Sequence, residues 1–267
     1  IGGTLIYDGQ AIALRGGEAR PEAGVVSLHY RPIDRLFATY SGTSYAAPLV
    51  AFKASQILAR FPDASANLVR ALLASSALPP EEALRRLEPL GGRAALDLCG
   101  HGLVDAERAS FSDDARVILY AEDELEIDHF AVYQIPIPDA FQTERGRRTV
   151  RVSLAYDPPV RHSRLDYNGV SMGFRLIRGC EPDLIFEHFR QRTAEEGPFP
   201  RVENRYNCDL SPSSTIREKS SLQTASVTFS RDIQQYGDNY YLVVRCAGGW
   251  AGDVGRQNFA VTVELSH

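Results

Sequence analysis

The chain has 267 residues, of which 44% are hydrophobic and 24% are charged, a balance typical of globular proteins rather than of disordered or fibrous ones. A formal net charge of -5 offers no basic surface for nucleic acid. No apolar run approaches the roughly 18 residues of a membrane-spanning helix. The composition therefore predicts neither a nucleic-acid partner nor a membrane partner.

The start of the chain and its cysteines bear on processing and compartment. The chain opens at Ile1 without an initiator methionine, a charged leader or an apolar signal core, so we expect that a preceding portion has been removed. The four cysteines, at positions 99, 180, 208 and 246, have no metal-ligand spacing and favour free buried thiols in a reducing compartment. We therefore expect a cytoplasmic location. An even count also permits one disulfide among Cys180, Cys208 and Cys246.

Two helices are predicted in the first part of the chain. Apolar residues cover most of the circumference of a helix expected over 45–60, as in helices at the middle of a domain. A second helix is expected over 66–76, with Asp63 or Ser65 as its N-cap. Its inner face is predicted to consist of Leu68, Leu72 and Leu73. We expect the two helices to pack against each other.

Beyond residue 112 the pattern changes to short alternating apolar runs separated by Pro, Gly, Asn and Asp. We therefore predict a first domain over 1–112 and a second over 113–267. We expect the second to be an antiparallel sandwich of jelly-roll type. Its strands are expected at 117–120, 130–137, 150–156, 172–177, 225–229, 240–245 and 259–265. Two long connections, about 178–201 and 204–221, hold most of the irregular sequence.

The run Ser41-Gly42-Thr43-Ser44-Tyr45-Ala46-Ala47-Pro48 stands immediately before the first predicted helix. Gly42 permits a tight turn, and Pro48 is expected in the first helical turn, where its missing N–H is tolerated. Ser44 then lies at a helix N-terminus, where N–H groups and the helix dipole would stabilise a negative charge beside its Oγ. The alternative is that Ser44 only caps a core helix.

This run resembles the serine motif of the subtilase family, Gly-Thr-Ser-x-Ala-x-Pro-x-Val-Ala. The matching positions are Gly42, Thr43, Ser44, Ala46, Pro48, Val50 and Ala51. Tyr45 stands where methionine is frequent, and Phe52 where glycine often follows. The resemblance implies that Ser44 is the catalytic nucleophile, supported by Gly42, Thr43 and Pro48.

Two further segments extend the resemblance to about residues 20–110. Residues 68–77 look like the next subtilase helix, and 100–106, Gly-His-Gly-Leu-Val-Asp-Ala, resemble the segment that closes the catalytic domain. The resemblance implies the C-terminal portion of an α/β domain, a parallel sheet with buried helices. No metal and no cofactor are predicted, because Asp/Asn ladders of calcium-site spacing are lacking.

In subtilases the triad follows the order Asp, His, Ser, with the oxyanion asparagine before the serine. Only His29 precedes Ser44, and it lacks the family's His-Gly-Thr context. The remaining histidines are expected to be structural or exposed: His101, His129, His162, His188 and His267. The chain is therefore predicted to be inactive alone and to pair with an N-terminal portion of the same peptidase that carries Asp, His and Asn.

Two functions remain open. The first is a serine endopeptidase that cuts peptide or protein substrates, with a partner ATPase as a weaker expectation from the resemblance. The alternative is a non-catalytic binding or scaffolding module derived from a subtilase. Residues 1–110 are expected to pack poorly without the N-terminal portion, and 113–267 to fold alone. Trp250, in a Gly-rich loop, is expected to fold back on the sandwich rather than to serve as an exposed recognition aromatic.

Overall fold

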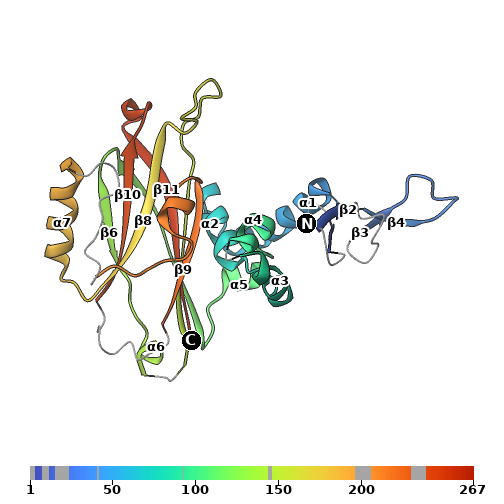
Figure 1. The fold of residues 1–267 in the computed structure, drawn as a ribbon, viewed down its shortest axis with the longest axis horizontal. Coiled ribbons are helices and arrows are strands. Elements are labelled where there is room, and N and C mark those ends of the chain that lie inside the picture. The colour runs from blue at the N-terminus through green and yellow to red at the C-terminus, as the bar shows by residue number, and fades with distance from the viewer. Residues whose placement is uncertain are drawn as a thin grey trace. The chain divides into compact units, whose positions relative to one another are not determined.

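The computed structural model describes residues 4–7, 12–15, 24–40, 42–91, 93–143, 146–195, 206–229 and 239–267 (Figure 1). The chain forms two compact units, Ile1–Ala59 and Arg60–His267, which divide near the end of helix α1 (Thr43–Arg60). The predicted domain boundary at 112/113 stays a prediction, because compactness alone does not define an independently folding domain.

The first unit contains two short hairpins and α1. The hairpins are β1 (Thr4–Tyr7) with β2 (Ile12–Arg15), and β3 (Val25–Leu28) with β4 (Phe37–Tyr40). Both pairs are antiparallel, so the expected parallel sheet is wrong for the described strands. Parallel neighbours need a crossover of about a dozen residues or more. Only four residues separate β1 from β2 and eight separate β3 from β4, which suffices only for hairpins.

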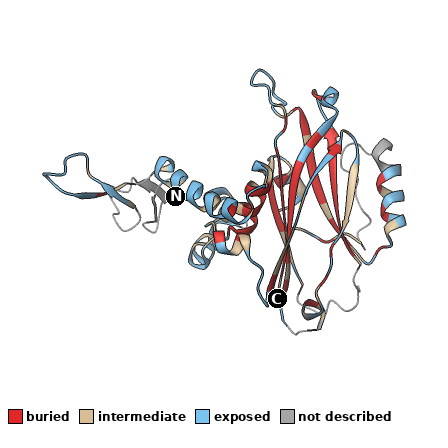
Figure 2. Cartoon of the chain, turned by 180° about the vertical axis from the view of Figure 1, so that it is seen from behind, coloured by how far each residue is buried: buried red, intermediate tan, exposed pale blue. Residues whose placement is uncertain are grey.

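Helix α1 confirms the helix expected over 45–60, but not its burial. Only Ile57 is buried among its residues, whereas Leu49 is 52% exposed and Phe52 is 60% exposed. Figure 2 shows most of α1 in the colour of exposed residues. The helix therefore presents large apolar side chains without a covering partner in the part of the chain that the structure describes.

All seven predicted strands of the second part are confirmed. They are β5 (Arg116–Glu126), β6 (Phe130–Gln134), β7 (Arg148–Tyr156), β8 (Val170–Arg178), β9 (Leu222–Phe229), β10 (Tyr240–Gly248) and β11 (Arg256–Ser266). They form a four-stranded sheet of order β5-β11-β7-β9 and a three-stranded sheet of order β6-β10-β8. All pairings are antiparallel, and each consecutive strand lies in the other sheet.

The main core fills the space between the two sheets. Alternate residues of each strand point inward, as strand geometry requires: Val150, Val152 and Leu154 from β7, and Met172, Phe174 and Leu176 from β8. Trp250 packs against this core, and its Nε1 donates a hydrogen bond to the Asp166 carbonyl at 2.8 Å. The expectation that Trp250 folds back on the sandwich is confirmed.

Helix α7 (Pro182–Glu195) covers the outer face of the three-stranded sheet (Figure 1). Ile185 and Phe189, one helical turn apart, pack with Tyr241 and Val243 of β10. The expectation of a mainly irregular connection over 178–201 is wrong for this segment. Proline at the first helical position and the four-residue spacing of Ile185 and Phe189 were the helix signals.

Helix α2 (Ala66–Ser76) covers the outer face of the four-stranded sheet, packing on β7, β9 and β11. Ser65 is its N-cap, as predicted, because its Oγ accepts a hydrogen bond from the Leu68 N–H at 3.1 Å. The helix expected at 45–60 belongs to the other compact unit, so its packing against α2 stays a prediction. Small residues on the sheet let α2 approach closely: Ser153, Ala155, Thr224, Ala260 and Thr262.

Short helices complete the described chain. They are α3 (Glu81–Leu87), η3 (Glu88–Leu90), α4 (Ala94–Cys99), α5 (Ala106–Ser110), α6 (Asp139–Thr143), α8 (Ser214–Arg217) and η5 (Gly252–Val254). All four cysteines are free thiols, three of them buried and Cys99 half-buried. Burial raises the pKa of Cys246 to about 12, so this thiol is neutral at physiological pH. None of the described helices is long and apolar enough to span a bilayer.

Candidate active-site serine and its surroundings

Ser44 is the second residue of α1 and is exposed. The first turn of the helix closes on the Gly42 carbonyl, which accepts hydrogen bonds from the N–H groups of Tyr45 at 3.1 Å and Ala46 at 3.2 Å. Ser44 therefore lies in the turn that carries the unsatisfied N–H groups and the positive end of the helix dipole. A negative charge that develops beside Oγ would be stabilised there.

An aromatic pair joins this turn to the preceding strand. The ring of Tyr45 stacks on that of Tyr40, the last residue of β4, with centroids 5.2 Å apart and an interplanar angle of 19°. Tyr45 was the main departure from the family's motif. Its ring contacts the strand that leads into the turn, and this contact restricts how β4 enters α1.

Pro48 lies deeper in the helix than expected. Because α1 begins at Thr43, two residues before the predicted start, Pro48 is its sixth residue rather than part of the first turn. A proline there cannot donate to the carbonyl four residues earlier, which is that of Ser44. The turn that carries Ser44 is thus released from one helical hydrogen bond.

The described residues provide no general base beside Ser44, because no hydrogen bond involves its Oγ. His29 lies in the β3–β4 connection, where its Nδ1 accepts a hydrogen bond from the Arg31 N–H at 3.1 Å. The other histidines lie in the second unit: His101 after α4, His129 between β5 and β6, His162 between β7 and β8, His188 on α7, and His267 at the chain end. Among the described residues of the first unit, Ser44 therefore has no hydrogen-bonded base and no triad.

The family-like segment 100–106 contains a glycine, Gly102, at a position where the backbone requires one. Backbone hydrogen bonds join Leu78 and Leu103 in both directions, at 3.1 and 2.9 Å. Gly102 has φ +109°, and a Cβ there would lie 2.2 Å from the Leu78 carbonyl carbon. Only glycine combines this backbone conformation with so close an approach. The motif therefore holds the segment after α4 against the segment after α2.

Asp105 then starts α5. Its Oδ1 accepts hydrogen bonds from the N–H groups of Glu107 at 2.9 Å and Arg108 at 3.1 Å, which is the geometry of an N-cap. The Asp105 N–H donates to the Oγ of Ser76, the last residue of α2, at 3.4 Å. The Val-Asp-Ala end of the motif thus caps α5 and links it to α2.

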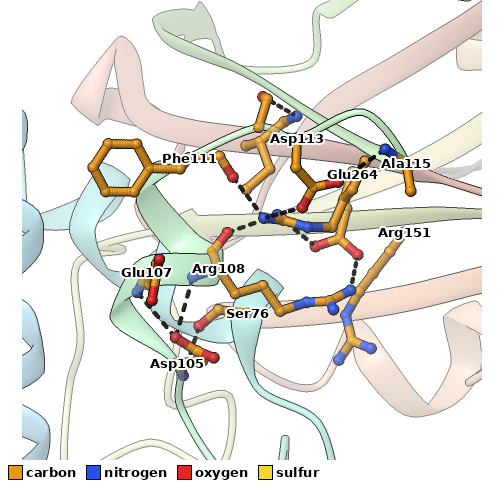
Figure 3. A network of polar contacts seen from close by, with 12 residues as sticks. Ser76, Asp105, Glu107, Arg108, Phe111, Asp113, Ala115, Arg151 and Glu264 are labelled. Atoms are coloured by element: carbon orange, nitrogen blue, oxygen red, sulfur yellow. Dashed lines mark hydrogen bonds and ion pairs between the residues drawn. The ribbon is translucent and has the colours of Figure 1, made fainter.

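A network of buried ion pairs and hydrogen bonds connects α5 to the sandwich (Figure 3). Glu264 of β11 is 2% exposed and forms ion pairs with Arg108 of α5 and, at 3.7 Å, with Arg116. Arg116 also donates to the carbonyls of Arg108 at 2.7 Å and Phe111 at 2.6 Å. No sequence pattern predicts this network as a whole. Its only signal was a glutamate within the apolar alternation of the last strand.

His101 and Arg151 lie at the edge of the same network. Arg151 donates from Nη2 to the Ala77 carbonyl at 2.7 Å. Burial, with the positive charge of Arg151 as the second cause, lowers the pKa of His101 from its ordinary value of 6.5. Within the described ranges, no three His, Cys, Asp or Glu side chains are grouped so that they could hold a metal ion.

Comparisons with known proteins agree with the motifs. Residues 5–102 match the model of the Subtilase family. The protein y4bN of Sinorhizobium fredii, described as uncharacterized, is 64% identical over 265 residues. The match covers 99% of this chain and 62% of that protein, so the chain spans less than two thirds of this relative.

A chain in the X-ray structure of tomato aspermy virus is similar over 70% of this chain and 94% of its own length. Its sequence identity is 14% and its TM-score is 0.27, values too low to support any argument. The family match, in contrast, contains both the Ser44 run and Gly102. Residues 5–102 are therefore similar to the subtilase family, and an antiparallel β-sandwich follows them in the same chain.

Proposed function

We propose that the chain carries the nucleophile of a subtilisin-type serine endopeptidase, with Ser44 as the attacking group. The observation that carries this proposal is the position of Ser44 in the first turn of α1, within a Gly-Thr-Ser run of a subtilase-family region. Gly42 receives the first helical hydrogen bonds and Thr43 begins the helix. A serine at such a turn combines an accessible hydroxyl with N–H groups that stabilise an oxyanion.

The reaction needs a base that takes the Ser44 proton and an acid that orients this base. We propose that both, together with an oxyanion asparagine, come from a part of the protein outside this chain. The y4bN relative is longer than the region it shares with this chain, so room for such a part exists in a protein of its kind.

The exposed face of α1 supports the same proposal. Large apolar side chains of this helix are exposed, including Tyr45, Leu49 and Val50 at its N-terminal half. Exposed apolar patches of this kind mark interaction surfaces in soluble proteins. We propose that the Asp- and His-bearing part covers this face and thereby delivers the base to Ser44.

Two further parts of the proposal rest on the resemblance: the substrate would be a peptide or protein, and a partner ATPase would act beside the peptidase. The proposed cytoplasmic location rests on the free cysteines. The sandwich would be of jelly-roll type, which the alternation of consecutive strands between the two sheets supports. No cofactor is proposed.

A second candidate is a binding or scaffolding module without catalysis. The observation that favours it is that Ser44 Oγ has no hydrogen-bond partner among the described residues. The first candidate predicts that a longer protein of this type hydrolyses a casein substrate and that Ser44→Ala abolishes the hydrolysis. Ser55→Ala is the matched control, because Ser55 is an exposed serine of the same helix. Equal activity of the Ser44→Ala variant and the parent would exclude Ser44 as the nucleophile.

A further inference from the structure

The connection between β7 and β8 is a closed loop at one end of the sandwich. Figure 1 shows it extending beyond the ends of the strands, and Figure 2 shows most of it in the colour of exposed residues. Val160 and Asn168 form an antiparallel bridge at its base, and the Arg161 N–H donates to the Tyr167 carbonyl at 3.1 Å. The loop therefore has a defined backbone conformation although its side chains are exposed.

The single tryptophan of the chain connects this loop to the sandwich. Trp250 packs against the core, and its indole N–H donates to the Asp166 carbonyl at 2.8 Å. The N–H groups of its two neighbours, Gly249 and Ala251, both donate to the Gly169 carbonyl at 3.1 Å. These hydrogen bonds fix the loop beside the Trp250 ring.

Two arginines of the loop lie over that ring. The guanidinium carbon of Arg161 is 4.4 Å from the ring centroid of Trp250, and that of Arg164 is 5.9 Å from it. Both distances are in the range of cation–π contacts. The ring attracts the two charges but uses none of their N–H groups as conventional hydrogen-bond donors, so these remain available to another acceptor.

Neither arginine is paired with an acid. Both side chains are exposed, and neither forms an ion pair or donates a hydrogen bond within the part of the chain that the structure describes, although the loop contains Asp166. Two like charges beside one ring repel each other, and a negative charge beside both would remove this repulsion. Other exposed arginines of the same unit do pair with carboxylates: Arg85, Arg93 and Arg256.

Exposed apolar side chains accompany the two cations. Leu165 directly follows Arg164 and is 105% exposed, and Val160 and Tyr167 are also exposed. One exposed leucine is common in soluble proteins, but here three apolar side chains and two unpaired arginines lie on one anchored loop. Tryptophan, tyrosine and arginine are also the residues most enriched at the energetic centres of protein interfaces.

We propose that the β7–β8 loop is a docking surface for an acidic peptide segment of a partner protein. Arg161 and Arg164 would bind its carboxylates, and Leu165 would contact an apolar side chain beside them. A guanidinium suits a carboxylate because two N–H donors meet two oxygens. A peptide suits the surface better than nucleic acid, because the chain has a net charge of -5. The surface lies on the sandwich and requires neither Ser44 nor peptidase activity.

Trp250 provides a direct measurement of binding, because it is the source of all tryptophan emission and both arginines contact its ring. The whole chain is titrated with a synthetic peptide that repeats Glu-Leu-Glu-Gly and with an analogue that has glutamine in place of glutamate. Fluorescence anisotropy of a labelled peptide measures the affinity independently. We expect the acidic peptide to bind and to change the Trp250 emission, and the analogue to bind about tenfold more weakly or less.

Paired variants separate the two arginines from positive charge in general. Arg161→Gln with Arg164→Gln should lower the affinity about tenfold or more, because both carboxylate contacts are lost. The matched control is Arg147→Gln with Arg190→Gln, which removes the same charge from exposed positions before β7 and on α7. Its affinity should stay within about twofold of the parent's, because distant exposed charges are screened. Lysine at positions 161 and 164 should give an intermediate affinity, because it keeps the charge without the planar donors.

Three results would overturn the proposal. The first is a parent chain that neither binds the acidic peptide nor changes its Trp250 emission. The second is equal binding by the parent and by the variant with Arg161→Gln and Arg164→Gln, which would place the peptide elsewhere. The third is tighter binding of a single-stranded oligonucleotide of equal charge, which would make nucleic acid the partner. Thermal unfolding of each variant confirms that the fold is retained.

Discussion

Helices α1 and α2 are both rich in apolar residues, but only α2 is buried. In α1, Ile57 is the single buried residue, whereas seven of the eleven residues of α2 are buried, among them Leu68 and Leu72. The difference lies in what each helix packs against. Helix α2 has a sheet face of small residues, and α1 has no comparable surface in the described chain. Apolar composition therefore identifies a helix that needs a partner without identifying the partner.

Residues 60–102 belong both to the subtilase-family match and to the compact unit that contains the sandwich. The subtilase-family match ends at residue 102, yet residues from Arg60 onward belong to the same compact unit as the sandwich. The last part of the family region is thus held by α2, by Gly102 and by the Glu264 network. The predictions below test this attachment, from the largest expected effect to the smallest.

The largest effect is expected at Glu264. Glu264→Ala removes the buried carboxylate that pairs with Arg108 and Arg116, and of these two guanidinium groups only that of Arg116 keeps a carboxylate partner, the exposed Asp113 at 3.4 Å. The free energy of unfolding should fall by about 3–5 kcal/mol in chemical denaturation. Glu126→Ala is the control, because Glu126 forms only exposed pairs and its loss should cost at most about 1 kcal/mol. Equal effects would show that the network does not hold α5.

A pair of leucines tests the two helices directly. Leu72 of α2 is fully buried, so Leu72→Ala should lower the free energy of unfolding by about 2–5 kcal/mol. Leu49 of α1 is 52% exposed, so Leu49→Ala should change it by no more than about 0.5 kcal/mol. Chemical denaturation of both variants measures the difference. A large effect at Leu49 would mean that α1 is buried in solution.

The N-cap of α2 gives a smaller effect. Ser65→Ala removes the hydroxyl that accepts from the Leu68 N–H and should cost about 1 kcal/mol. Ser65→Asp keeps an acceptor and should restore most of this loss. Hydrogen exchange of the first α2 amides would report the change locally. An unchanged exchange rate in Ser65→Ala would contradict the assigned cap.

The smallest effect concerns pH. The folded state disfavours protonated His101, since its pKa is lowered by burial and by Arg151. The corresponding stabilisation is complete above 6.5, the ordinary value, and is lost as the pH falls through the lower pKa of the folded state. His101→Gln should therefore flatten the loss of unfolding free energy between neutral and mildly acidic pH. An unchanged slope would show that His101 is not buried in this way.

The sequence predicts the individual helices and strands better than it predicts which of them pack or pair with each other. The seven strands follow from alternation, and α2 with its Ser65 cap follows from periodicity and capping chemistry. The parallel sheet was wrong, because a family resemblance says nothing about which strands of a part pair with each other. The Glu264 network joins residues more than 150 positions apart, as the Arg108–Glu264 pair shows, and no local pattern encodes such a contact. Ser44 was singled out from a local motif, and its catalytic role stays a prediction.

The proposed role of Ser44 is tested most directly by labelling with a fluorophosphonate probe, which reacts only with a serine activated by a base. The probe is applied to this chain alone and to a longer protein of the same type, each with and without Ser44→Ala. We predict labelling of the longer protein only, on the peptide that contains Ser44, and no labelling of its Ser44→Ala variant. A folded longer protein that remains unlabelled would contradict the assignment and favour a module without catalysis.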